Sequence, residues 1–257
     1  MFDDRDLHPE VARVRDARAP DAIVLDATRD FEVLPEPALD DVALRVDAID
    51  PHAYDAAWIP EAGPAFLDRL VARELTVGAP GDGSVAWTTQ TEPPVVIVKP
   101  RVQGSPDAFV SFLVAEALVE VGLDLPEHFL GFFADRYPAF ADAVPGDATE
   151  TYQLAAACLD AYRGLHTRDV FAEWTDDDLP TLADAWRDAG ERIRPRLGGL
   201  AAEVTQGDTA LGDAAELACS AVKHDLDVPT PFGALDVVAY RNHGPDYAVR
   251  WAEKLFG

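Results

Sequence analysis

Lysine is scarce in this sequence, and acidic residues far outnumber basic ones. The lysines are Lys99, Lys223 and Lys254, within a total of 21 basic residues against 47 aspartates and glutamates. The formal net charge is −26. Binding of free DNA or RNA needs a basic surface that displaces counterions from phosphates. The charge balance therefore argues against nucleic acid as a partner.

The excess of acidic residues also predicts the solvent in which the protein works. In ordinary salt so many like charges repel one another and destabilise a compact state. In molar salt the Debye length falls to about 3 Å, which screens the repulsion. We therefore expect a cytoplasmic protein of a salt-accumulating microbe. In such a protein the acidic surface reflects the solvent and does not indicate a cationic partner.

Cysteine and long apolar runs are also rare. Cys158 and Cys219 lie in apolar helical patterns without metal-binding spacing, so they predict two buried thiols. The longest apolar run, residues 109–123, is too short to cross a membrane and contains Glu116 and Glu120. The acidic start lacks the apolar segment of a signal peptide. These features predict a soluble, intracellular protein without membrane contact.

Familiar catalytic and nucleotide-binding motifs are missing from the sequence. It contains no Walker A sequence, no G-x-G-x-x-G, no G-x-S-x-G and no H-E-x-x-H. The Gly-Asp-Gly at 81–83 could cradle a phosphate, but it leads into a strand pattern, and Asp-Gly is a strong hairpin signal. We interpret it as a turn. The sequence predicts no metal site, and it leaves the cofactor and the oligomeric state open.

The patterns that are present predict an α+β fold that is mostly helical. A small three-stranded antiparallel sheet is expected over about residues 75–102, with strands in "LTVG", "SVAWTTQ" and "VVIVKPRV". Helical periodicity dominates elsewhere, including residues 19–31. We expect one domain over 1–257, with short helices and the β-meander in 1–104 and a helical bundle packed on the sheet in 105–257.

The central block "VGAPGDGSVAWTTQTEPPVVIVKPRVQGSPDAFVSFLVAEALVEVGLDLPEHFLGFFADRY", residues 77–137, carries a resemblance. Together with the acidic, lysine-poor composition, it resembles an uncharacterised protein family of halophilic archaea. The resemblance implies a halophilic source and a cytoplasmic location. It implies no activity, cofactor or catalytic residue.

Lys99 and Arg101 are the clearest candidates for ligand binding. A lysine at the end of an apolar strand is unexpected in a chain that otherwise uses arginine. Both cations suit a carboxylate or phosphate, and Ser105 is expected to cap a helix whose first N–H groups attract anions. The competing interpretation is that both cations pair with neighbouring acidic residues.

Acidic residues on the following helix form a second candidate set. Glu116, Glu120 and Asp124 share one stripe of that helix, with His128 shortly after it. Glu120 and His128 could act in acid–base chemistry or assist a metal. The alternative is that the stripe is the solvated face of the helix.

Two hypotheses for function follow from these patterns. The first is a non-catalytic module that interacts with a protein or a small anionic ligand. The second is an enzyme acting on a phosphate- or carboxylate-bearing substrate, with Lys99 and Arg101 as binding cations and Glu120 or His128 as reactive groups. The second requires Lys99 and Glu120 to line one pocket, so finding them on opposite faces would exclude it.

Overall fold

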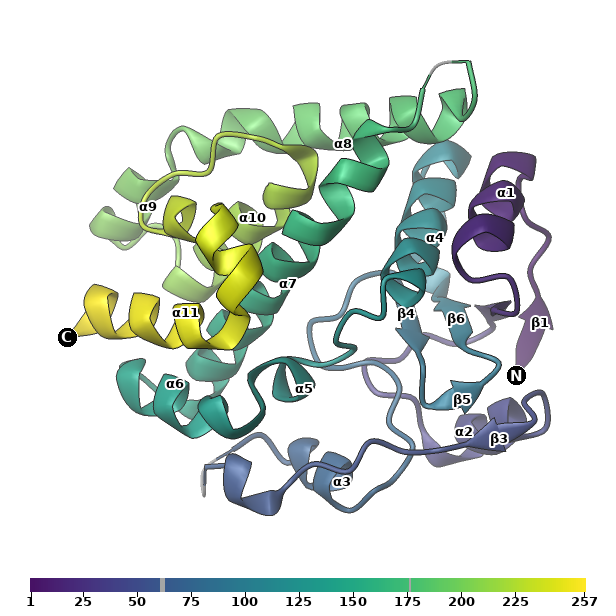
Figure 1. Cartoon of the computed structure of the whole chain (residues 1–257), viewed down its shortest axis with the longest axis horizontal. Coiled ribbons are helices and arrows are strands. Elements are labelled where there is room, and N and C mark those ends of the chain that lie inside the picture. Colours follow the sequence, from purple (N-terminus) through teal and green to yellow (C-terminus); the bar gives the residue numbers. More distant parts are fainter. Residues whose placement is uncertain (61–62, 176) are drawn as a thin grey trace. The chain divides into compact units, whose positions relative to one another are not determined.

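The computed structural model describes residues 1–60, 63–175 and 177–257 (Figure 1). The chain divides into two compact units. The sheet unit comprises residues 1–53, 65–127 and 174–185. The helical unit comprises residues 54–64, 128–173 and 186–257. Both units are therefore built from segments that are distant in the sequence. That the chain is one domain stays a prediction.

The structure confirms a mostly helical α+β fold. The strands are β1 (Phe2–Asp4), β2 (Ile23–Ala27), β3 (Ala48–Ile49), β4 (Val85–Thr88), β5 (Thr91–Glu92) and β6 (Val95–Val98). The α-helices are α1 (Pro9–Arg18), α2 (Glu36–Ala43), α3 (Leu67–Val71), α4 (Asp107–Gly122), α5 (Phe129–Phe133), α6 (Tyr137–Ala143), α7 (Ala148–Ala172), α8 (Pro180–Leu197), α9 (Leu200–Gln206), α10 (Leu211–Ser220) and α11 (Val238–Phe256). Short 3₁₀ helices are η1 (Ala56–Trp58), η2 (Pro100–Val102), η3 (Ala134–Arg136), η4 (Val222–His224) and η5 (Phe232–Leu235).

The main sheet is mixed and four-stranded, so the prediction of a three-stranded antiparallel meander was wrong. Its order is β1-β2-β6-β4, with β2 and β6 parallel and the other pairs antiparallel. The expected pairing of β4 with β6 is present, with Val85 opposite Val98. The predicted strand "LTVG" does not form: residues 75–78 are not a strand, and the carbonyl oxygen of Val77 accepts a hydrogen bond from the Leu34 N–H in a loop. A separate pair is formed by β3 and β5.

Strand β2 was predicted to be part of a helix over residues 19–31. Its sequence, Ile-Val-Leu-Asp-Ala, has no alternation of apolar and polar residues, and Val24 and Leu25 are both buried. The sequence of a strand that is buried on both faces is a short apolar run, and a buried helix segment can have the same pattern. Its pairing with β6, some seventy residues away in the sequence, decided the outcome.

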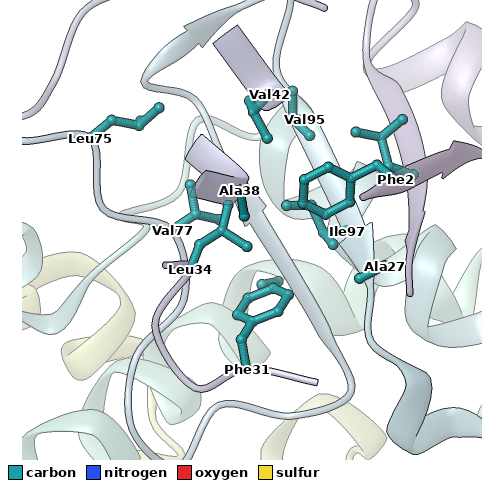
Figure 2. Packing of buried hydrophobic residues seen from close by; sticks show 12 residues of the cluster. Phe2, Ala27, Phe31, Leu34, Ala38, Val42, Leu75, Val77, Val95 and Ile97 are labelled. Atoms are coloured by element: carbon teal, nitrogen blue, oxygen red, sulfur yellow. The ribbon is translucent and has the colours of Figure 1, made fainter. Parts of the chain in front are cut away.

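One face of the sheet packs into a well-defined core within the sheet unit (Figure 2). Val95 and Ile97 of β6 contribute to this core together with Ala86 of β4 and Phe31 from the loop after β2. Successive side chains of a strand point to opposite faces. The residue that follows Ile97 by two positions, Lys99, is therefore directed to the same face, since its backbone is still extended (φ −83°, ψ 148°).

Helix α4 lies against β4 and β6 and also contacts α1 (Figure 1). The two helices approach closely at Gly122, where a Cβ would lie 2.3 Å from the carbonyl oxygen of Arg18. Glycine is needed there because any side chain would collide with this backbone. Helix α1 begins with Pro9 at its first position, as its sequence predicts.

Glu10 of α1 caps the N-terminus of α8 inside the sheet unit. Its carboxylate accepts hydrogen bonds from the Thr181 N–H (3.2 Å), the Thr181 hydroxyl (2.7 Å) and the Leu182 N–H (3.0 Å). Burial raises the pKa of this carboxyl group, but the hydrogen bonds outweigh burial and hold the pKa of Glu10 below its ordinary value.

The substitution Glu10→Ala is expected to lower the free energy of unfolding by about 1–2 kcal/mol at neutral pH, as for other lost helix caps. Because the folded-state pKa is lowered, this contribution is present above the unfolded-state pKa and is lost as the pH falls through the folded-state value. Urea unfolding of both proteins at several pH values should show the difference narrowing in acid. A difference that does not change with pH would contradict the cap.

The helical unit is organised around α7. Its N-terminus has the capping box predicted by its sequence: Asp147 accepts from the Glu150 N–H, and Glu150 accepts from the Asp147 N–H. Helix α10 packs against α7, and both cysteines are free and buried in these two helices, as predicted. From α11, the Tyr240 hydroxyl donates to the carbonyl oxygen of Cys158 (2.7 Å).

No helix in the described ranges is long and apolar enough to cross a membrane.

Candidate functional site

The ends of the two parallel strands bring several charged residues together at one edge of the sheet. Asp30 and Glu32 follow β2, Lys99 and Arg101 follow β6, and Asp82 precedes β4. The carboxyl ends of parallel strands form the edge at which ligands of α/β sheets commonly bind. We call these five residues the edge cluster.

Arg101 connects the loops of the edge cluster. Its guanidinium group binds the carboxylates of Asp30 (2.9 Å) and Glu32 (3.1 Å) and also donates to the carbonyl oxygens of Phe31 and Asp82. Its hydrogen bond lowers the pKa of Asp30. Arg101 therefore pairs with neighbouring acidic residues, as the competing interpretation of the sequence expected.

The Gly-Asp-Gly segment forms a turn, and its groups are engaged within the protein. The N–H of Asp82 donates to the carbonyl oxygen of Ala79 (3.0 Å), and the Asp82 carboxylate accepts from the Ala79 N–H (2.6 Å). The N–H of Gly81 donates to the Glu32 carboxylate (2.9 Å). The segment is therefore a turn, as predicted, but it is not the expected hairpin turn, because the residues before it do not form a strand.

Lys99 is the unusual member of the cluster because its side chain is fully buried. Its exposed fraction is 0%, and Nζ has no hydrogen-bond partner among residues 1–60, 63–175 and 177–257. Nζ lies 4.7 Å from the centroid of the Phe31 ring. At this distance a cation–π contact stabilises an ammonium group only in part. Figure 2 shows the core that includes this ring.

The surroundings of Lys99 disfavour its charged form. Burial is the main cause that lowers the pKa of Lys99, and Arg101 lowers it further. Asp82, Glu32 and Asp30 act in the opposite direction but do not restore the ordinary value. Placing an amine in this environment costs stability, and function is a common reason for retaining such a group.

Ser105 does not cap α4, contrary to the prediction. The cap position is occupied by Pro106, the helix begins at Asp107, and no side chain makes a capping hydrogen bond there. Proline fixes the backbone for helix entry, which explains how the helix starts without a hydroxyl. Ser105 lies in the turn before the helix, where its N–H donates to the carbonyl oxygen of Val102.

Glu120 lies on the opposite face of the sheet from Lys99. Its carboxylate accepts a hydrogen bond from Trp87 Nε1 (2.7 Å). Trp87 neighbours Ala86 in β4, and Ala86 belongs to the core on the Lys99 face. Because adjacent residues of a strand point to opposite faces, Trp87 and Glu120 lie on the α4 face. The enzyme hypothesis in which Lys99 and Glu120 share one pocket is therefore excluded by its own criterion.

The two glutamates of the acidic stripe do not form a solvated face of α4. Glu116 and Glu120 are each only 8% exposed, whereas Asp124 is exposed and follows the helix in a positive-φ turn. His128 is also buried, and it belongs to the helical unit, where it immediately precedes α5. Within the described ranges, no group of three or more histidine, cysteine, aspartate or glutamate residues is placed to hold a metal.

A buried polar network that the sequence did not reveal lies at the other end of β4. The Glu127 carboxylate accepts from the Thr88 hydroxyl (2.9 Å), the Thr89 N–H (3.1 Å) and Gln90 Nε2 (2.9 Å). His52 Nε2 lies 3.4 Å from the same carboxylate.

The polar run at residues 88–90 was the available signal for this network, although it looks exposed in the sequence. Thr88 and Gln90 are in fact 0% and 2% exposed. Polar residues between two apolar strands are typical of an exposed turn, and only the tertiary structure shows that Glu127 returns to them. Glu127 therefore ties the chain after α4 to the end of β4.

Comparison with known proteins identifies a family without assigning an activity. No curated protein and no solved structure matches the chain. The model of a family of unknown function (DUF7089) matches residues 1–257, which is the whole sequence. The chain is therefore a member of DUF7089, a family of unknown function.

Proposed function

We propose that this protein is a non-catalytic module that binds a small anionic ligand at the edge cluster, in the cytoplasm of a salt-accumulating cell. The observation that carries the proposal is the buried Nζ of Lys99, which has no hydrogen-bond partner among the described residues. A ligand oxygen placed against Nζ would supply the missing acceptor. The acidic, lysine-poor composition supports the compartment.

The charges of the edge cluster restrict the kind of ligand. Asp30, Glu32 and Asp82 give three carboxylates against the two cations Lys99 and Arg101. Arg101 already binds two of the carboxylates, so Lys99 is the basic side chain left to bind an external group. A multiply charged phosphate would be repelled by the carboxylates. We therefore favour a small monocarboxylate that presents one oxygen pair to Lys99.

The other predicted ligand residues have supporting roles in this proposal. Arg101 holds the loops after β2 and before β4 in place around Lys99. Ser105 lies in the turn that leads from η2 into α4, and it could contact a ligand extending from the cluster. Gly83 follows Asp82 of the cluster, and no atom lies within 4 Å of the position that its Cβ would occupy.

The test is thermal unfolding with sodium acetate at constant ionic strength, comparing wild type with Lys99→Met. A bound ligand at about ten times its Kd stabilises the folded state by about 1.4 kcal/mol. We expect acetate to raise the melting temperature of the wild type and to have no effect on Lys99→Met. Because methionine replaces a buried amine that lacks a partner, the variant should fold at least as stably.

Two glycine variants provide a matched control. Gly83 and Gly198 are both exposed, neither has a positive φ, and neither has an atom within 4 Å of the Cβ position. Gly83→Ala should weaken the response to acetate, and Gly198→Ala in the helical unit should leave it unchanged. An equal response to acetate in the wild type and Lys99→Met would overturn the proposal.

A further inference from the structure

We infer that Lys99 reacts with its ligand: its amine forms an imine with the carbonyl carbon of a small aldehyde or 2-oxo acid. This inference rests on the proposed function, since it assigns the chemical class of ligand at the same site. It goes further by making Lys99 a nucleophile as well as a hydrogen-bond donor.

The position of Lys99 favours a neutral amine. Nζ is fully buried at the end of β6, on the core face of the sheet and above the Phe31 ring. It has no hydrogen-bond acceptor in the described ranges that would hold it as an ammonium ion.

The charged groups that act on Nζ come from three segments: Arg101 after β6, Asp82 before β4, and Asp30 and Glu32 after β2. Arg101 disfavours the ammonium ion, and the three carboxylates favour it. Asp30 and Glu32 are bound to Arg101, which limits how much they offset burial. Burial of the amine dominates, so its pKa is lowered. A neutral lysine amine is a good nucleophile, whereas the ammonium ion is not.

The reaction balances without a further reactant. Nζ attacks the carbonyl carbon and forms a C–N bond, which gives a carbinolamine. The carbinolamine then loses the former carbonyl oxygen as water, with both hydrogens supplied by the amine. The product is a neutral imine, so no ammonium ion has to be present in the core. The carboxylate of a 2-oxo acid can remain toward the loops at the sheet edge.

The scarcity of lysine makes the test direct. Lys254 lies near the end of α11 and is exposed, and Lys223 is half-buried. If burial only protects Lys99, exposed Lys254 should react first and Lys99 last. If Lys99 is a nucleophile, that order is reversed.

The experiment incubates the folded full-length protein in molar salt with glyoxylate and sodium cyanoborohydride, which reduces an imine to a stable amine. Peptide mass spectrometry then measures the modified fraction of each lysine over time. We expect Lys99 to be modified before Lys254, because a lowered pKa raises the neutral fraction of the buried amine. Modification of Lys254 with Lys99 left unmodified would overturn the inference. This comparison uses the wild-type chain and requires no variant to fold.

The variant Lys99→Arg separates the inference from the proposed function. Arginine keeps a positive donor at the position but does not form the imine. Acetate stabilisation retained in Lys99→Arg, with the adduct present only in the wild type, supports both. Acetate stabilisation of the wild type without a Lys99 adduct overturns the imine and keeps the binding site. A wild type that shows neither response overturns both.

Discussion

Lowering the salt concentration from molar to about 0.1 M is expected to unfold this protein. The chain has a net charge of −26. At 1 M salt the Debye length is about 3 Å, and at 0.1 M it is about 10 Å, so each acidic residue then repels many more neighbours. Circular dichroism should show loss of helical signal as salt is removed. An unchanged, cooperative melt at 0.1 M would show that the composition does not reflect a saline solvent.

Exposed ion pairs are too weak to compensate for this repulsion. Arg13 with Asp178 and Arg194 with Glu191 are largely solvent-exposed pairs. Exposed pairs contribute about 0–1 kcal/mol each. A control distinguishes screening from specific ion binding: potassium chloride and sodium chloride at equal ionic strength should stabilise the protein equally if screening is the cause.

The substitution Glu127→Ala is expected to lower the free energy of unfolding by about 2 kcal/mol or more. It leaves the Thr88 hydroxyl and the Thr89 N–H without their acceptor in a largely buried site, whereas Gln90 Nε2 keeps the Thr76 carbonyl oxygen and the Thr88 hydroxyl. Each buried polar group without a partner costs about 1–3 kcal/mol. Urea unfolding in molar salt measures the loss.

Two variants make the comparison with Glu127→Ala specific. Glu127→Gln keeps one oxygen as an acceptor and should lose about half as much stability. Glu253→Ala removes an exposed carboxylate from α11 and should change stability by about 0.5 kcal/mol or less. If Glu127→Ala proves as stable as Glu253→Ala, the network does not stabilise the fold.

Local patterns were reliable where the interactions are local. The capping box of Asp147 and Glu150, the start of α1 at Pro9 and the pairing of β4 with β6 all involve residues close together in the chain. Strands β1 and β2 were missed because their place in the sheet depends on partners distant in sequence. The lack of alternation in β2 removed the remaining signal.

For the candidate site, too, the sequence alone identified some features and only the tertiary structure decided others. The sequence alone identified Lys99 as an unexpected cation at the end of an apolar strand, and it predicted an acidic, lysine-poor protein for a saline solvent. Only the tertiary structure decided that Arg101 is bound by Asp30 and Glu32, and that Lys99 and Glu120 lie on opposite faces of the sheet. The physical reason is that two features determine which side chains meet. One is the alternation of side chains between the two faces along each strand, and the other is the parallel pairing of β2 with β6. Both depend on contacts between segments far apart in the chain.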